Sequence, residues 1–376
     1  MRGTVQIASS KAEREEIYRL RYDIYIEEME GRERHSEADP HARQFSDDWD
    51  VHAHHFYASQ DGRMVGSARL LFRRDGPFEC ESQFELKRFE PAFPDHVSMS
   101  SRMAVHPGLR GSHLLKNLAC AMFTFARDHA IRFDFIDCHP RLLPLYSRLG
   151  YRIYRPGFNH PKYTYVVPMV LVLDDADYLD RIRSPFATIA EDYPRSSDGT
   201  ELLLSRFPGF ATDVQSAVCD VEEFWDVLKH RLLTLSDRKR RCDILNGFSD
   251  EEMKSVTSVG HLVPCREGDV VLNVADPCRE LFVILSGRFQ VTGTVQGPFG
   301  EVRIVKLLEA GESFGEIRFL TEHIRYATVT AVEDSRLLVL SAKALERLTM
   351  TEPVTAAKLY RNLARLVANR LQDVTV

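Results

Sequence analysis

The first apolar pattern along the chain has helical spacing. Ser10 and Glu13 are three residues apart, so the hydroxyl and the carboxylate can cap each other's free backbone N–H groups. The apolar residues that follow recur every three or four positions: Ile17, Leu20 and Ile24. This arrangement predicts a helix over residues 12–29.

The residues that follow, up to about 175, predict a mixed layer of strands and helices. Asp61-Gly62 separates two β-like runs and is a strong hairpin signal, because both residues tolerate positive φ. A row of apolar residues on one face predicts a second helix over 112–129. The other expected elements are strands at 54–60, 64–73, 99–105, 133–138, 151–154 and 163–173, and a short helix at 142–149.

The pattern changes twice in the second half. Strand signals disappear from about 176 to 240, and charged helical stretches such as 221–235 predict a helical connector. Seven glycines then punctuate short β-like runs between Val263 and Leu340, which favours an antiparallel barrel or double-sheet roll before a final helix. The predicted fold class is α+β, with a mixed α/β domain at 1–175, the connector at 176–240 and a β-roll with flanking helices at 241–376.

Composition narrows the class of protein. Of the 376 residues 44% are hydrophobic and 28% are charged, proportions typical of a soluble globular protein. The longest apolar stretch, 165–173, is far shorter than the ~20 residues that an integral membrane helix needs. The N-terminus carries no apolar signal run, so we expect a cytoplasmic location.

Charge and cysteine usage exclude further classes. The net charge is −6 and no long basic run occurs, which argues against nucleic acid as a partner. The seven cysteines are scattered and never have CxxC spacing, so we expect reduced thiols and no metal site. His52, His54 and His55 alternate along a predicted strand without a matching carboxylate set, and we interpret them as hydrogen-bonded histidines.

The stretch from Gly311 to Val329 has the features of an anion site. Its glycines permit a tight turn, and a one-turn helix beginning near Glu316 would direct unpaired N–H groups at an anion. Arg325, nine residues later, adds a planar cation that suits a phosphate. A carboxylate at Glu316, next to an anion, is explained if it accepts hydrogen bonds from a sugar hydroxyl.

Phe314-Gly315-Glu316 and Arg325-Tyr326-Ala327-Thr328-Val329 resemble the phosphate-binding cassette of cyclic-nucleotide-binding domains. The resemblance covers about 245–376. It implies that Glu316 holds the ribose 2′-hydroxyl and that Arg325 holds the cyclic phosphate of cAMP or cGMP, a regulator whose base the bulk of Tyr326 leaves open. The implied binding set is Phe314, Gly315, Glu316, Ile317, Arg325, Tyr326, Ala327 and Thr328.

Other interpretations of this half stay open. The cassette could be a fold element only, with Glu316 and Arg325 paired to each other. Only about two dozen residues follow Thr351, too few for the DNA-reading module that many relatives carry. The apolar stripe of the final helix could lie over the nucleotide, form a homodimer with a second copy, or pack on its own roll.

The order of strand, loop and helix over 99–129, followed by Leu145-Tyr146-Ser-Arg-Leu149-Gly150-Tyr151, resembles the acyl-CoA-dependent N-acyltransferase (GNAT) superfamily. The resemblance implies that the loop binds the thioester donor and that Tyr146 protonates the departing thiolate. Backbone N–H groups of Met103–Val105 would stabilise the oxyanion. The implied donor-binding set is Met103, Ala104, Val105, Arg110, Gly111 and Ser112.

Four blocks, at 20–28, 48–50, 65–70 and 101–105, look like long-chain N-acyl amino acid synthases and acyl-homoserine lactone synthases. The resemblance implies a fatty-acyl thioester, on acyl carrier protein or CoA, attacked by the amine of a small acceptor. Asp48 or Asp50 would position the amine or relay its proton, and Arg69 or Arg102 would hold an acceptor carboxylate. Met99 stands where lactone synthases commonly carry a glutamate, so the general base is unassigned.

Two further functions compatible with the sequence are a nucleotide-gated protein lysine acetyltransferase and a non-catalytic sensor of acyl groups or nucleotides. At the level of single residues, Arg21 could form an ion pair on a helix surface. Arg69 could form a cross-strand salt bridge, and Tyr146 could be a half-buried packing residue.

Overall fold

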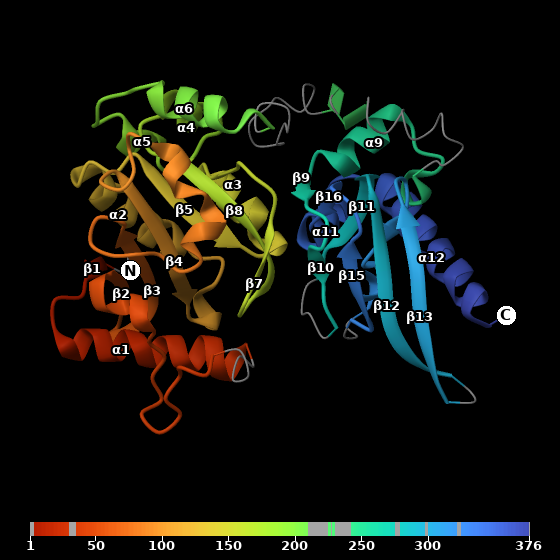
Figure 1. The fold of residues 1–376 in the computed structure, drawn as a ribbon, viewed down its shortest axis with the longest axis horizontal. Coiled ribbons are helices and arrows are strands. Elements are labelled where there is room, and N and C mark those ends of the chain that lie inside the picture. Colours follow the sequence, from red (N-terminus) through yellow and green to blue (C-terminus); the bar gives the residue numbers. More distant parts are fainter. Residues whose placement is uncertain are drawn as a thin grey trace. The chain divides into compact units, whose positions relative to one another are not determined.

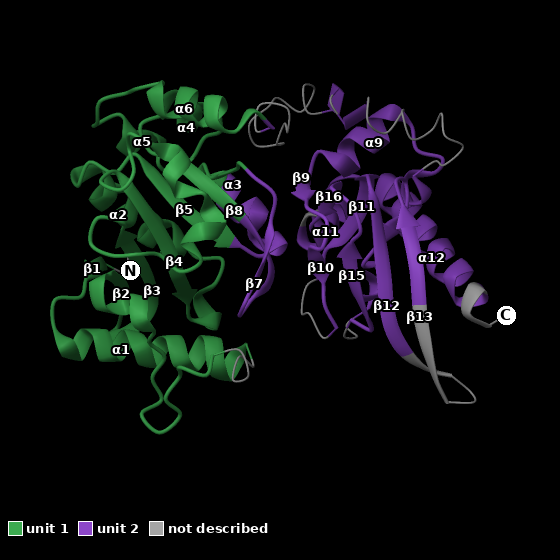
Figure 2. Cartoon of the chain, in the orientation of Figure 1, with its two compact units in different colours: residues 1–137, 148–154, 168–208 green, residues 138–147, 155–167, 209–376 purple. Residues whose placement is uncertain are grey.

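The structure is a computed structural model that describes residues 4–29, 35–209, 225–226, 228–229, 242–274, 279–297, 300–321 and 325–375. The chain divides into two compact units (Figures 1 and 2), made of residues 1–137, 148–154 and 168–208 and of residues 138–147, 155–167 and 209–376. The predicted α+β class is confirmed. The predicted domain boundaries stay a prediction, and most of the helix predicted at 221–235 lies outside the described residues.

The first sheet has the strand order β1-β2-β3-β4-β5-β8-β6, and β7 pairs with β8. The predicted hairpin joins β2 to β3, with φ of 51° at Asp61 and 74° at Gly62. β4 and β5 pair in parallel, from Val97↔Phe133 to Met99↔Phe135. The strands are β1 (Thr4–Ile7), β2 (His54–Gln60), β3 (Arg63–Phe72), β4 (Val97–Val105), β5 (Phe133–Cys138), β6 (Arg152–Ile153), β7 (Phe158–His160) and β8 (Thr164–Val172).

The helices α1 (Lys11–Arg21) and α2 (Leu114–Asp128) pack against β2 and β3. The capping box of Ser10 and Glu13 begins α1 as predicted. The predicted helix then continues as a π-helix, η1 (Tyr22–Glu28), rather than as an α-helix. π-Helical turns are rare and frequently occur at functional sites. The remaining helices before residue 210 are α3 (Leu143–Leu149), α4 (Ala176–Arg181), α5 (Ala187–Ala190) and α6 (Asp198–Arg206).

A bulge interrupts the pairing of β3 with β4. Ser67 pairs with Ala104 and Arg69 pairs with Ser101, so two residues of β4, Arg102 and Met103, lie opposite Ala68 alone. Arg102 has a φ of 51°, in the left-handed region that non-glycine residues seldom occupy. The bulge therefore changes the direction of the Arg102 side chain relative to a regular strand.

The second half forms the predicted roll from two antiparallel sheets, ordered β10-β15-β12-β13 and β14-β11-β16-β9. Leu359, Leu363 and Leu366 of α12 are buried in the roll's apolar core, so this part of the final helix packs on its own roll, whereas Leu371 is exposed. The homodimer stays a prediction. The elements are β9 (Gly260–Cys265), β10 (Val270–Leu272), β11 (Leu281–Ser286), β12 (Arg288–Gly297), β13 (Gly300–Glu309), β14 (Ser313–Phe314), β15 (Ala327–Ala331), β16 (Ser335–Leu340), η7 (Asp243–Leu245), α9 (Asp250–Thr257), α10 (Glu316–Leu320), α11 (Ala342–Thr351) and α12 (Pro353–Thr375).

We expect Gly66→Val to destabilise the first sheet by about 1–3 kcal/mol, the usual cost of overpacking a core. A Cβ at Gly66 would lie 3.1 Å from Leu118 and 3.2 Å from Leu114, because α2 packs closely on β3 there. Urea unfolding followed by circular dichroism measures the loss. Gly108→Val is the control, since a Cβ at Gly108 would meet only the His106 ring, at 3.6 Å. Equal effects of the two substitutions would contradict the prediction.

Candidate functional sites

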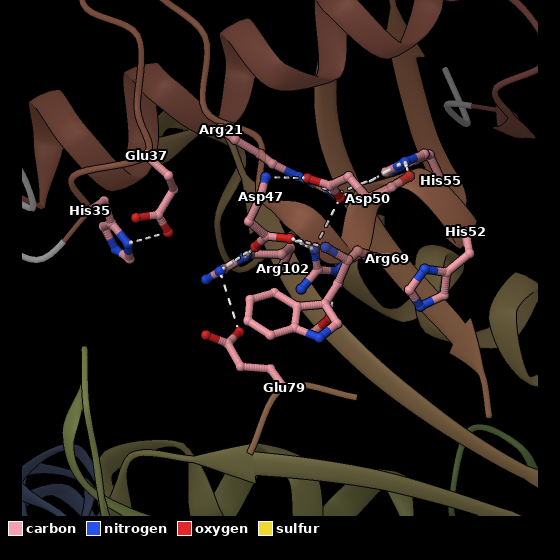
Figure 3. Close-up of polar contacts among 12 residues, drawn as sticks. Arg21, His35, Glu37, Asp47, Asp50, His52, His55, Arg69, Glu79 and Arg102 are labelled. Carbon is pink, nitrogen blue, oxygen red and sulfur yellow. Dashed lines mark hydrogen bonds and ion pairs between the residues drawn. The ribbon is translucent and has the colours of Figure 1, made fainter. Parts of the chain in front are cut away.

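Five charged side chains converge beside the β4 bulge (Figure 3). Arg21 Nη1 donates to Asp50 Oδ1 at 2.8 Å, and Arg69 Nη1 donates to the same oxygen at 3.0 Å. Arg69 also donates to Asp47, and Arg102 Nη2 donates to Asp47 Oδ2 at 2.5 Å. All five side chains are almost completely buried. We call Arg21, Asp47, Asp50, Arg69 and Arg102 the ionic cluster.

Local backbone structure brings these side chains together. Arg21 is the last residue of α1, where the π-helix begins. Asp47 and Asp50 cap each other's backbone N–H groups at the start of a short 3-10 helix, η2 (Asp48–His52). Arg69 lies opposite Ser101, whose hydroxyl accepts from its Nε at 2.9 Å, and Arg102 lies in the bulge.

The cluster leaves one positive charge unbalanced, because it has three arginines and two aspartates. Glu79 lies 3.6 Å from Arg102 and supplies a further negative charge. Burial acts to raise the pKa of Asp47, but the positive charges of Arg69 and Arg102 outweigh it and the net pKa is lowered. Burial also acts to raise the pKa of Asp50, but the positive charges of Arg21 and Arg69 outweigh it and hold the pKa of Asp50 well below its usual range. Both aspartates are therefore ionised and weakly basic.

His55 completes the network and is neutral. Burial and the charge of Arg21 lower the pKa of His55 to about 4. Its Nδ1 lies 3.2 Å from Arg21 Nη2, which can only donate, so Nδ1 accepts. The proton is then on Nε2, which donates to the Asp50 carbonyl oxygen at 3.2 Å. A neutral imidazole thus satisfies Arg21 without adding a fourth positive charge.

The structure brings together three of the residues predicted for catalysis, Asp50, Arg69 and Arg102. Asp48 is exposed and takes no part in the ionic cluster, because the residue that caps η2 is its neighbour Asp47. The sequence prediction missed Asp47, although two aspartates three residues apart are a capping signal. Arg21 is completely buried in this network, so its interpretation as a helix-surface ion pair is wrong.

The residues predicted to bind the acyl donor lie on β4 and the loop after it. Ala104 and Val105 are buried, and the carbonyl oxygen of Met103 accepts from Tyr25 Oη of the π-helix at 3.4 Å. Arg110 forms a two-pronged ion pair with Glu28, at 2.5 and 2.7 Å. The loop after β4 is therefore tied to the end of the π-helix.

The rest of the predicted donor and acid residues are more exposed or lie elsewhere in the chain. Gly111 has a φ of 85°, and the exposed Ser112 accepts from the N–H of Leu114 at the start of α2. Tyr146 lies half-buried on α3. Oxyanion stabilisation by Met103–Val105 and proton donation by Tyr146 stay predictions. In the part of the chain that the structure describes, no group of three or more His, Cys, Asp or Glu could hold a metal ion.

A second candidate site is the cassette between β14 and β15. Gly315 has a φ of 94°, and a Cβ there would lie 2.7 Å from the carbonyl oxygen of Glu280 and 3.0 Å from Arg325 Nη1. Glycine is therefore required for the turn that leads into α10. The backbone of Gly315 therefore lies directly against Glu280 and the guanidinium of Arg325.

Arg325 and Glu316 of the cassette are buried in the roll. Arg325 is 5% exposed and donates to the carbonyl oxygens of Gly315, at 2.8 Å, and Glu280, at 3.0 Å. Glu316 is also buried. Thr328 donates to the side chain of Asn273 at 3.1 Å. Among the other predicted binding residues, Phe314 is buried, Ala327 is half-buried, and Ile317 and Tyr326 are exposed.

Comparison with known families supports both interpretations. Residues 16–173 match the family model "N-acyl amino acid synthase FeeM", and residues 262–352 match the "Cyclic nucleotide-binding domain". These matches confirm the two resemblances drawn from the sequence. They also confirm that the first half has the character of an acyltransferase.

Individual relatives cover parts of the chain. The cyclic AMP receptor protein of Thermus thermophilus is 32% identical over 130 residues, which make up 35% of this chain and 57% of the relative. The crystal structure of the Thermus thermophilus catabolite activator protein is 30% identical, covering 35% of this chain and 60% of that one, with a TM-score of 0.31. The structure of a CoA-dependent acyl-homoserine lactone synthase, BjaI, is 18% identical. The match covers 54% of this chain and 100% of that one, with a TM-score of 0.40. This chain thus spans little more than half of the first relative's length.

Among the described residues, no helix is both long enough and apolar enough to cross a membrane.

We expect His55→Gln to remove part of the pH dependence of stability. The folded pKa of about 4 lies below the ordinary value of 6.5, so the stabilisation is present above pH 6.5 and is lost as the pH falls towards 4. Between pH 7 and pH 5 the free energy of unfolding should fall by about 2 kcal/mol more in the wild type than in the variant. Urea titrations at several pH values measure this difference, and parallel curves for the two proteins would contradict it.

Proposed function

We propose that this protein is an N-acyltransferase controlled by a cyclic nucleotide. It transfers a fatty-acyl group from an acyl thioester, on acyl carrier protein or CoA, to the amine of an amino acid or a similar small acceptor. The observation that carries this proposal is the ionic cluster beside the β4 bulge, inside the range that matches the N-acyl amino acid synthase model. Such a buried network holds its charged groups in fixed positions.

Arg102 is the residue best suited to hold an acceptor carboxylate. Arg69 directs its donors to Asp47, Asp50 and Ser101, so its role in this proposal is to position the aspartates. Arg102 lies at the side of the cluster that faces Glu79, whose side chain is 15% exposed and 3.6 Å away. A substrate carboxylate can replace Glu79 there and balance the positive charge of Arg102 through a planar, two-pronged contact.

The reaction forms a C–N bond and breaks a C–S bond. The amine attacks the thioester carbonyl, and backbone N–H groups of Met103–Val105 stabilise the resulting oxyanion. Asp47 and Asp50, which are ionised, accept hydrogen bonds from the acceptor's ammonium group and orient it before it loses its proton. The departing thiolate takes a proton from Tyr146. The ammonium group loses its proton to solvent water before the attack, and solvent water restores the proton of Tyr146.

The nucleotide acts at the cassette. The cyclic phosphate of cAMP or cGMP binds at the Gly315 turn and Arg325, and its ribose 2′-hydroxyl donates to Glu316. Support comes from the left-handed Gly315, whose Cβ position is blocked, and from the family match over 262–352. The nucleotide changes transfer activity only as far as it binds one arrangement of the protein more tightly than another.

Mass spectrometry of the products tests the proposed reaction. The full chain is incubated with fatty-acyl carrier protein, fatty-acyl-CoA and acetyl-CoA, each with pooled amino acids, with a lysine peptide, and with or without cAMP and cGMP. A long-chain N-acyl amino acid whose yield changes with nucleotide is the expected product. An acetylated peptide would indicate a lysine acetyltransferase instead, and no product with any donor would indicate a sensor.

We expect Arg102→Lys to raise the KM for the acceptor by at least tenfold and to change the KM for the acyl thioester little. Lysine keeps the charge but loses the planar fork that matches a carboxylate. Steady-state kinetics with each substrate varied in turn measures both constants. Arg63→Lys is the matched control, because Arg63 is exposed on β3. An unchanged acceptor KM would remove Arg102 from this role.

We expect Arg325→Ala to weaken cyclic-nucleotide binding by at least the ~1.5–3 kcal/mol of a charge-assisted hydrogen bond. Isothermal titration calorimetry with cAMP and cGMP measures the change. Arg288→Ala is the control, because Arg288 is an exposed arginine of the same roll whose guanidinium pairs with Glu333 at 3.0 Å. Equal affinities in wild type and Arg325→Ala would show that Arg325 does not hold the phosphate.

A further inference from the structure

The β7–β8 hairpin belongs to the same compact unit as the roll. β7 and β8 pair at Asn159↔Tyr165, so these two side chains lie on the same face of the hairpin. Residues 155–167, which include both, are part of the second unit, as the colours of Figure 2 show. The rest of β8, from Pro168 to Val172, is part of the first unit. A single strand therefore leads from the unit of the roll into the first sheet.

Asn159 binds an edge of the roll through its carboxamide. Its Nδ2 donates to the carbonyl oxygen of Val270 at 2.9 Å, and its Oδ1 accepts from the N–H of Val270 at 3.0 Å. β10 is the edge strand of the sheet ordered β10-β15-β12-β13, and edge strands present backbone groups that no neighbouring strand satisfies. The side chain of Asn159 therefore takes the place of a neighbouring strand at Val270.

Tyr165 anchors the same face of the hairpin on β9. The residue is 1% exposed, and its Oη donates to the carbonyl oxygen of Pro264 at 3.2 Å, with Cys265 Sγ 3.3 Å away. The N–H of Gly157 donates to the same carbonyl oxygen at 3.4 Å. A Cβ at Gly157 would overlap the Tyr165 ring, so glycine is required there. The hairpin thus contacts two strands of the roll, and we call Asn159 and Tyr165 the hairpin contact.

The strand that binds Asn159 is held in turn by β15, which carries the last residues of the cassette. Val270 of β10 pairs with Thr330 of β15. Thr328, one of the residues implied to bind the nucleotide, donates to the side chain of Asn273, just beyond β10, at 3.1 Å. A displacement of β15 is therefore passed to β10 and to the carboxamide of Asn159 that is bonded to it.

The other end of β8 leads towards the ionic cluster. β6 pairs with β8 at Arg152↔Val170, inside the first unit. In the strand order β4-β5-β8 only β5 separates β8 from β4, whose bulge holds Arg102. Because neighbouring strands of a sheet are hydrogen-bonded to one another, a shift of β8 changes the packing of β5 and β4.

We propose, on the basis of the nucleotide-controlled acyltransferase described above, that the hairpin contact is the connection through which the nucleotide changes acyl transfer. The contact is the two-state element: it is made in this structure, and it is broken in the alternative arrangement. The nucleotide controls transfer as far as it binds one of the two arrangements more tightly, and β8 carries the difference into the first sheet.

Transfer kinetics of the full chain test the proposal. The measured quantity is the ratio of the rates with and without saturating cAMP or cGMP, whichever the wild type binds. In Asn159→Ala and in Tyr165→Phe this ratio should move towards one by at least about twofold, because the contact that couples the two sites is weakened. Asn159 is exposed and Tyr165→Phe keeps the ring, so both variants should fold.

Gln60→Ala is the matched control, because it removes an exposed carboxamide from a strand of another hairpin in the first sheet. It should keep the wild-type ratio. A wild-type ratio in both Asn159→Ala and Tyr165→Phe would overturn the hairpin contact as the connection. The rate without nucleotide, measured for every variant, separates a lost response from a lost activity.

Hydrogen exchange of the full chain separates this proposal from the proposed function. Without nucleotide, Asn159→Ala should speed the exchange of the Val270 amide, and Gln60→Ala should not. In the wild type, nucleotide should change the exchange of the Gly157 and Val270 amides. A nucleotide that changes the transfer rate but neither amide would overturn the hairpin contact and leave the proposed control intact. If the wild type binds neither cAMP nor cGMP at millimolar concentration, or transfers no acyl group, the proposed function fails and this proposal fails with it.

Discussion

The buried charges of the ionic cluster impose the strictest constraint on the first half of this protein. Arg21, Asp47, Asp50, Arg69 and Arg102 are almost completely withdrawn from water, so each charge requires a partner with good geometry. The capping turn at η2, the bulge in β4 and the neutral His55 each meet part of that requirement. A network that leaves little freedom to its members has a fixed electrostatic field and tolerates substitution poorly.

Much of the fold could be predicted from the sequence, because its local signals agree with the tertiary structure. The capping box at Ser10, the hairpin at Asp61-Gly62 and the glycine-punctuated roll occur as predicted. Apolar spacing could not reveal the π-helix, since one changed hydrogen-bond register leaves the periodicity nearly intact. The β4 bulge was also missed, because it arises from pairing with β3 and leaves no mark in the pattern of β4 itself.

The candidate sites, like the fold, were predictable only where the residues involved are close in sequence. The motif residues Gly315, Glu316 and Arg325 are close in sequence, and Arg325 donates to the carbonyl oxygen of Gly315, so this contact was predictable. Glu316 pairs with Arg370, which lies 54 positions away on another helix, and no spacing rule connects the two. The sequence analysis predicted Asp48 instead of Asp47, because a resemblance between short motifs does not show which aspartate side chain is buried. That choice follows from the cap of η2.

The π-helix Tyr22–Glu28 makes the winding of this segment unusually critical. It connects buried Arg21 at one end to Glu28, the partner of Arg110 in the loop after β4, at the other. Ordinary α-helical winding of the same residues would rotate everything beyond the turn by about 100°, because a π-turn takes one residue more than an α-turn. Tyr25, Ile26 and Glu28 would then point away from their present neighbours. The hydrogen-bond register of this segment, together with its side chains, therefore decides which residues meet.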